Sequence, residues 1–231
     1  MSTVRSRFDA ADPATARLLE PRNDIVREEA EGDGTFIAVE GPFRSYRRTV
    51  RTADRGYEQE IEFQLGVPWF GWLFTWLSAR TLRTHPYHDG RQPWWGPPDR
   101  LTPRQARVLG LLGAAALAVG FLNTLFTQTV AFAADEFGAS ERAQGIAGTI
   151  VRCGIVFAIG LVFLADRRGR RTMLLMALWA GPLLAALGAF APSFAVLTAT
   201  QTLARPLAIA LGLLVGIVAA EEMPRNSRAY G

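Results

Sequence analysis

The sequence of 231 residues contains no lysine, two histidines and a single cysteine, Cys153. One cysteine excludes a disulfide scaffold and any zinc or redox site built on paired cysteines. Acidic residues are scarce in the second half, with 6 Asp and Glu in residues 108–231 against 15 in residues 1–107. The net charge is +4, and all 25 positive side chains are arginines, most of which flank apolar runs. This distribution indicates attraction to an anionic membrane surface rather than to nucleic acid.

Long runs with almost no charge fill the second half of the chain. Residues 108–134 carry no charge, residues 143–165 carry only Arg152, and residues 172–220 carry only Arg205. A helix needs about 20 residues to cross a hydrocarbon layer about 30 Å thick, and backbone in lipid must be helical. The first two runs therefore predict one span each, and the third is long enough for two. We expect membrane-spanning helices near 104–134, 142–165, 172–191 and 194–220.

The flanking arginines predict the orientation of these spans. Residues 80–107 hold six arginines, residues 166–171 hold four and residues 221–231 hold two, whereas residues 135–142 hold one arginine against three acids. The positive-inside rule therefore places the N-terminus, the 166–171 loop and the C-terminal tail in the cytoplasm. The N-terminus is polar and resembles no cleavable signal peptide. We expect a multi-pass protein of the plasma or inner membrane.

The residues before the first span predict a separate cytoplasmic piece. Residues 1–33 are acidic, rich in arginine and poor in large apolar groups, and they predict a disordered or loosely helical N-terminus. Residues 34–65 contain three short segments rich in β-branched and aromatic residues. In the third segment, Ile61, Phe63 and Leu65 alternate with acidic or amide side chains, which is typical of a half-buried strand. We expect a short β meander over 34–65, and such a sheet needs a cover.

Residues 66–103 are rich in tryptophan and arginine. The stretch 66–79 is too short to span a membrane and holds five large aromatic residues. Segments of this kind favour the membrane interface, although packing of the tryptophans on the strands stays open as an alternative. His85, His88 and Asp89 follow, with a proline between the two histidines. Because a third strong ligand at helical spacing is missing, we predict a plain loop here and no metal site.

The cytoplasmic loop between the second and third spans has an ordered pattern of charge. It reads Leu164-Ala165-Asp166-Arg167-Arg168-Gly169-Arg170-Arg171. A tight turn between two helices needs the backbone freedom of Gly169. The four arginines would hold the turn at the cytoplasmic face, and Asp166 can pair with an arginine or lie near a helix N-terminus. The segment resembles the signature loop of the major facilitator superfamily of secondary transporters, GxLADRxGRRxxL, with Val162 in place of the first glycine.

A second segment resembles a loop of the sugar-porter-like members of that family. It reads Glu221-Glu222-Met223-Pro224-Arg225-Asn226-Ser227-Arg228-Ala229, similar to ExxPxxxRG with an alanine in place of the glycine. The resemblance implies that the acid and the arginine of this loop join a cytoplasmic charge network with the signature loop. The predicted latch on the inner gate comprises Asp166, Arg167, Gly169, Arg170, Arg171, Glu221 and Arg228.

Two arginines, Arg152 and Arg205, lie within the predicted spans. A charge at that depth costs about 2.5–3.5 kcal/mol on insertion scales, so each should face a cavity or a partner. The four spans contain no Asp or Glu, which leaves a solute anion or acids on other helices as partners. We predict a solute pathway, with structural or snorkelling arginines as the open alternative. The predicted pathway residues are Arg152 and Arg205 with Asn123, Thr127, Gln128 and Gln201 as uncharged neighbours.

These observations predict an all-α membrane protein of four transmembrane helices with a small β-containing cytoplasmic extension. The resemblance implies the first third of a major facilitator fold, an N-terminal or truncated portion whose remaining helices are missing from this chain. It implies transport of a small solute, either anionic or sugar-like. A membrane-anchored module that binds a lipid or apolar ligand, or a non-functional fragment, is the alternative. Since no nucleotide-binding loop, nucleophile constellation or metal cluster is visible, we expect neither an enzyme nor a cofactor.

Overall fold

A computed structural model describes residues 1–54, 56–84 and 89–230 of the chain. The chain divides into two compact units. The first, called the sheet unit, consists of residues 1–111 together with 219–231. The second, called the helical unit, consists of residues 112–218.

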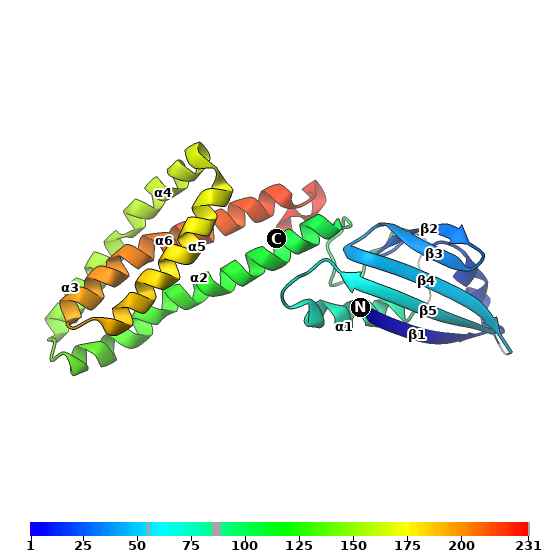
Figure 1. Ribbon diagram of the computed structural model, residues 1–231, viewed down its shortest axis with the longest axis horizontal. Helices are drawn as coiled ribbons and strands as arrows, with labels where there is room; N and C mark the ends of the chain where they lie inside the picture. Colours follow the sequence, from blue (N-terminus) through cyan, green and yellow to red (C-terminus); the bar gives the residue numbers. More distant parts are fainter. Residues whose placement is uncertain (55, 85–88, 231) are drawn as a thin grey trace. The chain divides into compact units, whose positions relative to one another are not determined.

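The sheet unit is built on five antiparallel strands in the spatial order β1-β5-β4-β3-β2 (Figure 1). Strands β3, β4 and β5 follow one another within the 34–65 stretch that the sequence assigned to a meander. The strands are β1 (Ser2–Asp9), β2 (Arg27–Gly32), β3 (Thr35–Glu40), β4 (Phe43–Ala53) and β5 (Gly56–Leu65), and a short 3₁₀ helix, η1 (Pro13–Leu19), lies between β1 and β2.

The N-terminal residues differ from the prediction of a disordered or loosely helical segment over 1–33. They supply both edge strands, because β1 pairs with β5 and β2 pairs with β3. Val4 lies opposite Ile61 in the core, and Arg5 lies opposite Glu60, with which it forms a 2.7 Å salt bridge. Charged residues of opposite sign thus face each other across the strands, a pairing that stabilises a sheet although each strand alone looks polar. The chain therefore combines a five-stranded sheet with apolar helices, and the expected all-α class with a small extension is corrected.

The core of the sheet unit lies on one face of the sheet. Along β5, Gln59, Ile61 and Phe63 are buried while Glu62 and Gln64 are exposed, which is the expected alternation. Aromatic rings pack across strands, with the Phe43 and Phe63 ring centroids 5.6 Å apart at a nearly perpendicular angle. The main buried cluster comprises Val4, Ile25, Val26, Phe43, Tyr46, Ile61, Phe63 and Leu82.

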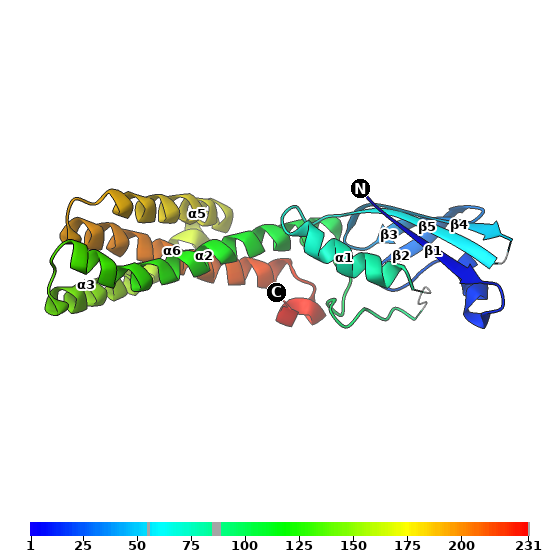
Figure 2. The same ribbon diagram turned by 90° about the horizontal axis from the view of Figure 1, so that it is seen from below.

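Helix α1 (Gly71–Leu82) covers part of this face (Figure 2). It contacts β5 and β1 and buries Ser78 and Leu82, whereas Trp72 and Trp76 remain exposed. The sequence left open whether the 66–79 stretch covers the strands or faces a membrane. In the structure the small and aliphatic side of the helix packs on the sheet and the tryptophan side does not.

Four helices of the chain are long and apolar enough to cross a membrane, judged by length and composition over the described residues. Their bounds lie within a few residues of those expected from the apolar runs. Two of them extend beyond the helical unit, since α2 begins and α6 ends in the sheet unit. The helices are α2 (Pro103–Glu136), α3 (Glu141–Cys153) continued by α4 (Ile155–Arg168), α5 (Arg170–Leu187) with the 3₁₀ turn η2 (Gly188–Phe190), and α6 (Phe194–Glu222).

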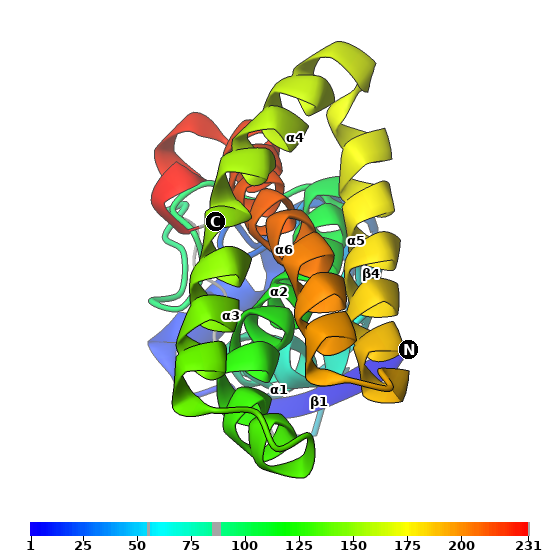
Figure 3. The same ribbon diagram turned by 90° about the vertical axis from the view of Figure 1, so that its left-hand side faces the viewer.

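Helix α6 is the central element of the helical unit (Figure 3). Buried clusters join it to α2 and α5 through Leu122 and Ala185, and to α4 and α5 through Ala165 and Met173. A third cluster brings Phe194, the first residue of α6, against α3. The other helices of the unit thus pack on α6 at different heights.

The second predicted span is interrupted at Gly154, between α3 and α4. A Cβ atom at Gly154 would lie 3.1 Å from Pro206 Cδ and 3.4 Å from the Thr202 carbonyl oxygen. Glycine therefore permits α6 to approach this junction closely, at the point where Pro206 removes a backbone donor from α6. An apolar run of sequence does not show where two helices come into close contact, so this contact could not be predicted.

Candidate functional site

The helical unit has small residues inside and large apolar residues outside. A water-soluble bundle would show the reverse arrangement, because large apolar side chains gain most from leaving water. Alanine at helix contacts and large apolar groups on the outer surface are the arrangement that a lipid environment favours. The buried set includes Ala147, Ala158, Ala165, Ala177, Ala185, Ala204, Ala208 and Ala210; the exposed set, each 63–77% exposed, includes Phe121, Phe132, Phe157, Phe163, Trp179 and Leu183.

A single residue, Gly169, joins α4 to α5. Its φ of 94° and ψ of 127° lie where residues with a Cβ atom are strained, so the predicted need for glycine in this turn is met. Asp166 Oδ1 accepts hydrogen bonds from Arg170 Nη2 at 3.2 Å and Arg170 Nε at 3.3 Å. The carboxylate thus pairs with an arginine one helical turn away, across the glycine. Arg167 and Arg171 are exposed on either side of the turn.

Arg205 ties α6 to α2. Its Nη1 atom donates to the carbonyl oxygen of Asn123 at 2.7 Å, and the side chain is half-buried. Gln201, one turn earlier on α6, is buried beside the Gly188 backbone, where a Cβ atom would lie 3.0 Å from Gln201 Nε2. The structure therefore brings Arg205 and Asn123 together and places Gln201 on the same helix as Arg205.

The other predicted pathway residues share no described side-chain contact with Arg205. Arg152 on α3 and Gln128 on α2 are exposed, as is Thr127, whose hydroxyl donates to backbone carbonyls of its own helix. A groove of about 620 Å³ runs between α3 and α6, but its lining is almost wholly apolar and includes none of these residues. Its walls include Ile146, Ile150, Phe194, Thr198 and Leu203. This groove therefore does not test the predicted pathway, which stays a prediction.

The second predicted charge loop belongs to the sheet unit. Glu221 is exposed at the end of α6, and Arg228 is exposed in the 3₁₀ helix η3 (Arg225–Tyr230). The neighbouring Glu222 forms a 3.6 Å salt bridge with Arg104, so the end of α6 lies beside the start of α2. Because Asp166 and Arg167 lie in the helical unit, their predicted latch with Glu221 and Arg228 stays a prediction.

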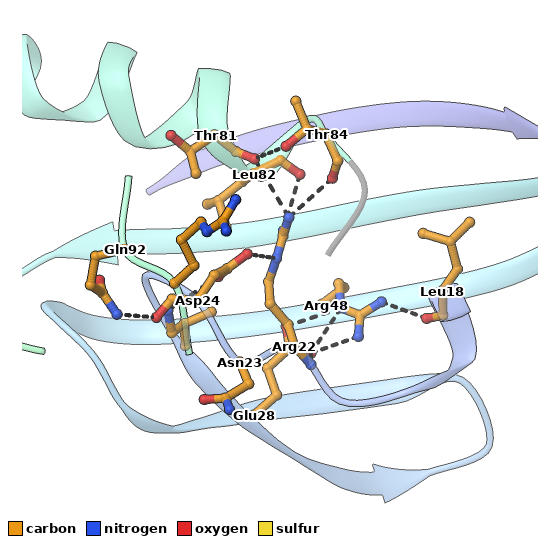
Figure 4. A network of polar contacts seen from close by, with 12 residues as sticks. Leu18, Arg22, Asn23, Asp24, Glu28, Arg48, Thr81, Leu82, Thr84 and Gln92 are labelled. Atoms are coloured by element: carbon orange, nitrogen blue, oxygen red, sulfur yellow. Dashed lines mark hydrogen bonds and ion pairs between the residues drawn. The ribbon is translucent and has the colours of Figure 1, made fainter. Parts of the chain in front are cut away.

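The sheet unit contains a buried charge network that the sequence did not predict (Figure 4). Arg48 of β4 and Glu28 of β2 form a 2.6 Å salt bridge in which both side chains are fully buried. Arg22 and Asp24 form a second, 2.8 Å pair that is equally buried. A signal was present for Arg48, since Tyr46, Arg48 and Val50 alternate along β4 and must share its inward face.

Each arginine of this network also satisfies backbone carbonyls. Arg48 donates to Leu18 and Glu20, at 2.7 and 2.8 Å, and its guanidinium lies 4.0 Å from the centre of the Phe36 ring. Arg22 donates to Leu82 and Thr84 near the end of α1, at 3.2 and 3.0 Å. Fully hydrogen-bonded ion pairs of this kind hold elements together in one arrangement.

Burial and neighbouring charges shift the pKa values of two members of the network, Arg22 and Tyr46. Burial lowers the pKa of Arg22, but the negative charges of Asp24 and Glu28 outweigh it, so the net pKa is raised. Burial first, and then the charge of Glu28, raises the pKa of Tyr46 well above its ordinary value. The Tyr46 hydroxyl therefore stays neutral and donates to Glu28 Oε1 at 2.5 Å. The network has the properties of a structural cross-link.

No cluster of three His, Cys, Asp or Glu side chains within the described ranges could hold a metal ion. His85 and His88 lie outside those ranges, and Asp89 forms a 3.8 Å ion pair with Arg91.

No family model, no curated protein and no solved structure matches this chain. The family resemblance of the 164–174 segment therefore rests on its own residues and on their place between two apolar helices.

Arg48→Ala should destabilise the sheet unit far more than Arg47→Ala. The first change leaves Glu28 buried without its cation, at a cost of about 3–5 kcal/mol. Arg47 is the preceding residue on the same strand, and its salt bridge with Glu31 is exposed. Loss of that salt bridge should therefore cost less than about 1 kcal/mol. Urea unfolding of the full chain in detergent, followed by tryptophan fluorescence, measures both values. Equal losses from the two variants would contradict the network's role.

Gly169→Ala and Gly160→Ala should change stability in opposite directions. At both positions a Cβ atom would meet nothing within 4 Å, so the two changes differ only in backbone conformation. Alanine at Gly169 must adopt a φ near 94°, at a cost of about 1–3 kcal/mol. Alanine within α4 at Gly160 should instead stabilise that helix by roughly 0.5–1 kcal/mol. Thermal unfolding in one detergent compares them, and a shift of the same sign in both would refute this geometry of the turn.

Proposed function

We propose that this chain is part of a secondary transporter of the major facilitator type, embedded in the plasma or inner membrane with its N-terminus in the cytoplasm. The four apolar helices cross the bilayer and contribute to a pathway for a small solute. The sheet unit lies on the cytoplasmic side.

The single observation that carries the proposal is the Gly169 turn. It joins two helices of membrane-spanning length, pairs Asp166 with Arg170, and leaves further guanidinium groups exposed on both sides. An ordinary positive-inside loop needs arginines, but it needs neither the carboxylate nor the left-handed glycine between two charged pairs. This order of residues supports a loop that acts as a latch on the inner gate.

The outer surface of the helical unit supports its place in lipid. Its exposed phenylalanine, leucine and tryptophan side chains would be costly in water, at about 25 cal/mol for each Å² of apolar surface. In lipid the same surface costs nothing, and the alanine-lined contacts around α6 provide close packing.

The charge of the spans favours a solute with negative charge. Arg152 and Arg205 are the cations within the apolar runs 108–134, 143–165 and 172–220, and these runs contain no acid. A guanidinium carries five donors in a planar fork that suits carboxylate or phosphate oxygens. Arg205 directs one of them to Asn123 and is only half-buried, so it can place others toward a solute.

Arg205→Ala should lower transport while Thr129→Ala leaves it unchanged. A hydrogen bond to a charged group contributes about 1.5–3 kcal/mol, so its loss should slow uptake roughly tenfold or more at low solute concentration. Thr129 is a matched control because it is exposed on α2 and its hydroxyl bonds only its own helix, at Leu125. Proteoliposomes holding the complete transporter that is proposed to include this chain are tested with radiolabelled monocarboxylates, dicarboxylates, phosphate and hexoses. Absence of uptake above protein-free vesicles would contradict transport, and equal uptake by the wild type and Arg205→Ala would contradict the role of Arg205.

A further inference from the structure

Aromatic rings of α1 and of the residues just before it lie on the surface of the sheet unit. Trp69, Trp72 and Trp76 are 60, 75 and 62% exposed, and Phe74 is 41% exposed. A helix that only covered a sheet in water would turn these rings inward, because they have the most apolar area to bury. Helix α1 instead buries Ser78 and Leu82. Within the described sheet unit, the tryptophan side of α1 therefore stays mostly exposed.

The start of α1 lies beside the first turns of α2. A Cβ atom at Gly110 would lie 2.9 Å from Val67 Cγ1 and 3.1 Å from Pro68 Cδ, so the chain entering α1 rests directly on α2 there. Gly110 belongs to the uncharged run 108–134, which is the apolar part of the first span. These residues all belong to the sheet unit. The tryptophans therefore begin at the level where α2 would enter the hydrocarbon.

The end of α1 is fixed to the sheet by the buried charge network. Arg22, which pairs with Asp24, donates to the carbonyl oxygens of Leu82 and Thr84 (Figure 4). The Leu82 carbonyl lies at the end of α1, where carbonyl groups have no donor within the helix. Contacts with α2 at the start of α1 and with Arg22 at its end oppose a rotation of the helix that would turn its tryptophans toward the sheet.

The charge of this segment complements an anionic surface. Residues 66–84 contain no acid, and Arg80 and Arg83 are exposed. Trp72, Trp76 and Arg80 follow one another at intervals of one helical turn, so they share a face of α1. Tryptophan prefers the headgroup level of a bilayer, and arginine beside it is attracted to anionic lipids.

The N-cap residue of α1 also carries an exposed aromatic ring. Phe70, at the N-cap, has a φ of 57° and is 40% exposed. A left-handed conformation is common for glycine or asparagine but unfavourable for a bulky residue, and Phe70 also supplies no side-chain cap to the helix. An aromatic ring in this position is costly for folding and places one more apolar group on the exposed side.

From these contacts we propose that α1 lies in the headgroup layer of the cytoplasmic leaflet and inserts Trp69, Trp72 and Trp76 among anionic lipids. The helix thereby docks the sheet unit on the membrane beside the first span. This inference rests on the proposed insertion of the helical unit, and the test separates the two.

The test compares three full-length variants that each keep one of the six tryptophans and carry phenylalanine at the other five. The first keeps Trp76. The second keeps Trp95, which is partly buried against the sheet core and is the control. The third keeps Trp179, which is exposed in the middle of α5 and reports insertion of the helical unit. Each is reconstituted in vesicles of phosphatidylcholine and phosphatidylglycerol that contain lipid brominated either near the headgroup or near the chain end.

Bromine near the headgroup should quench roughly half of the Trp76 fluorescence and leave Trp95 almost unchanged, while bromine near the chain end should quench Trp179. If Trp179 is quenched but Trp76 behaves like Trp95, docking on lipid is overturned, and the aromatic surface is covered by protein, such as a second copy of this chain. If Trp179 is not quenched either, membrane insertion fails and the docking proposal fails with it. Circular dichroism of each variant checks that the sheet and helices are retained.

Discussion

The apolar outer surface of the helical unit is the constraint on which the rest of the structure depends. Many of its large apolar side chains lie on the outer surface and alanines line much of its interior, so close approach of the helix backbones adds to the burial of a few larger groups such as Leu211 and Leu214. Gly154, against Pro206 and the Thr202 carbonyl of α6, shows how close that approach is. Such packing is adequate only where the surroundings are as apolar as the surface, which is the condition that lipid supplies.

The sheet unit follows the opposite rule. Its core consists of aromatic and β-branched side chains, as expected for a fold stabilised by the hydrophobic effect in water. The core also encloses the ion pairs Arg48–Glu28 and Arg22–Asp24. Buried pairs contribute little net stability compared with apolar residues, but they hold their partners in one arrangement because a broken pair is costly. Here the partners are the 18–24 segment, the sheet and the end of α1. The network therefore connects the sheet to the helix that carries the exposed tryptophans.

The sequence was sufficient where a local pattern decides the structure. Apolar runs with at most one charge, each long enough as a helix to cross a bilayer, predicted the four long helices. Period-two alternation predicted β5. Long-range pairing could not be read in the same way: β1 and β2 look polar alone, and only the register that places Arg5 opposite Glu60 makes β1 a strand. The contact of Arg205 with Asn123 depends on the rotation of two helices about their axes, which an apolar run does not fix. Exposure likewise cannot be read from an apolar run: Arg152 and Gln128 are exposed, whereas Gln201 is buried.

Labelling of single cysteines in intact cells tests most directly whether the four helices cross a membrane. In a Cys153→Ser background, Glu136→Cys marks the end of α2 and Arg168→Cys marks the end of α4, and both positions are exposed. If the helices span the bilayer with the Gly169 turn in the cytoplasm, a membrane-impermeant maleimide labels Glu136→Cys in intact cells and reaches Arg168→Cys only after permeabilisation. Labelling of both positions in intact cells, or recovery of the chain in the soluble fraction, would contradict this account.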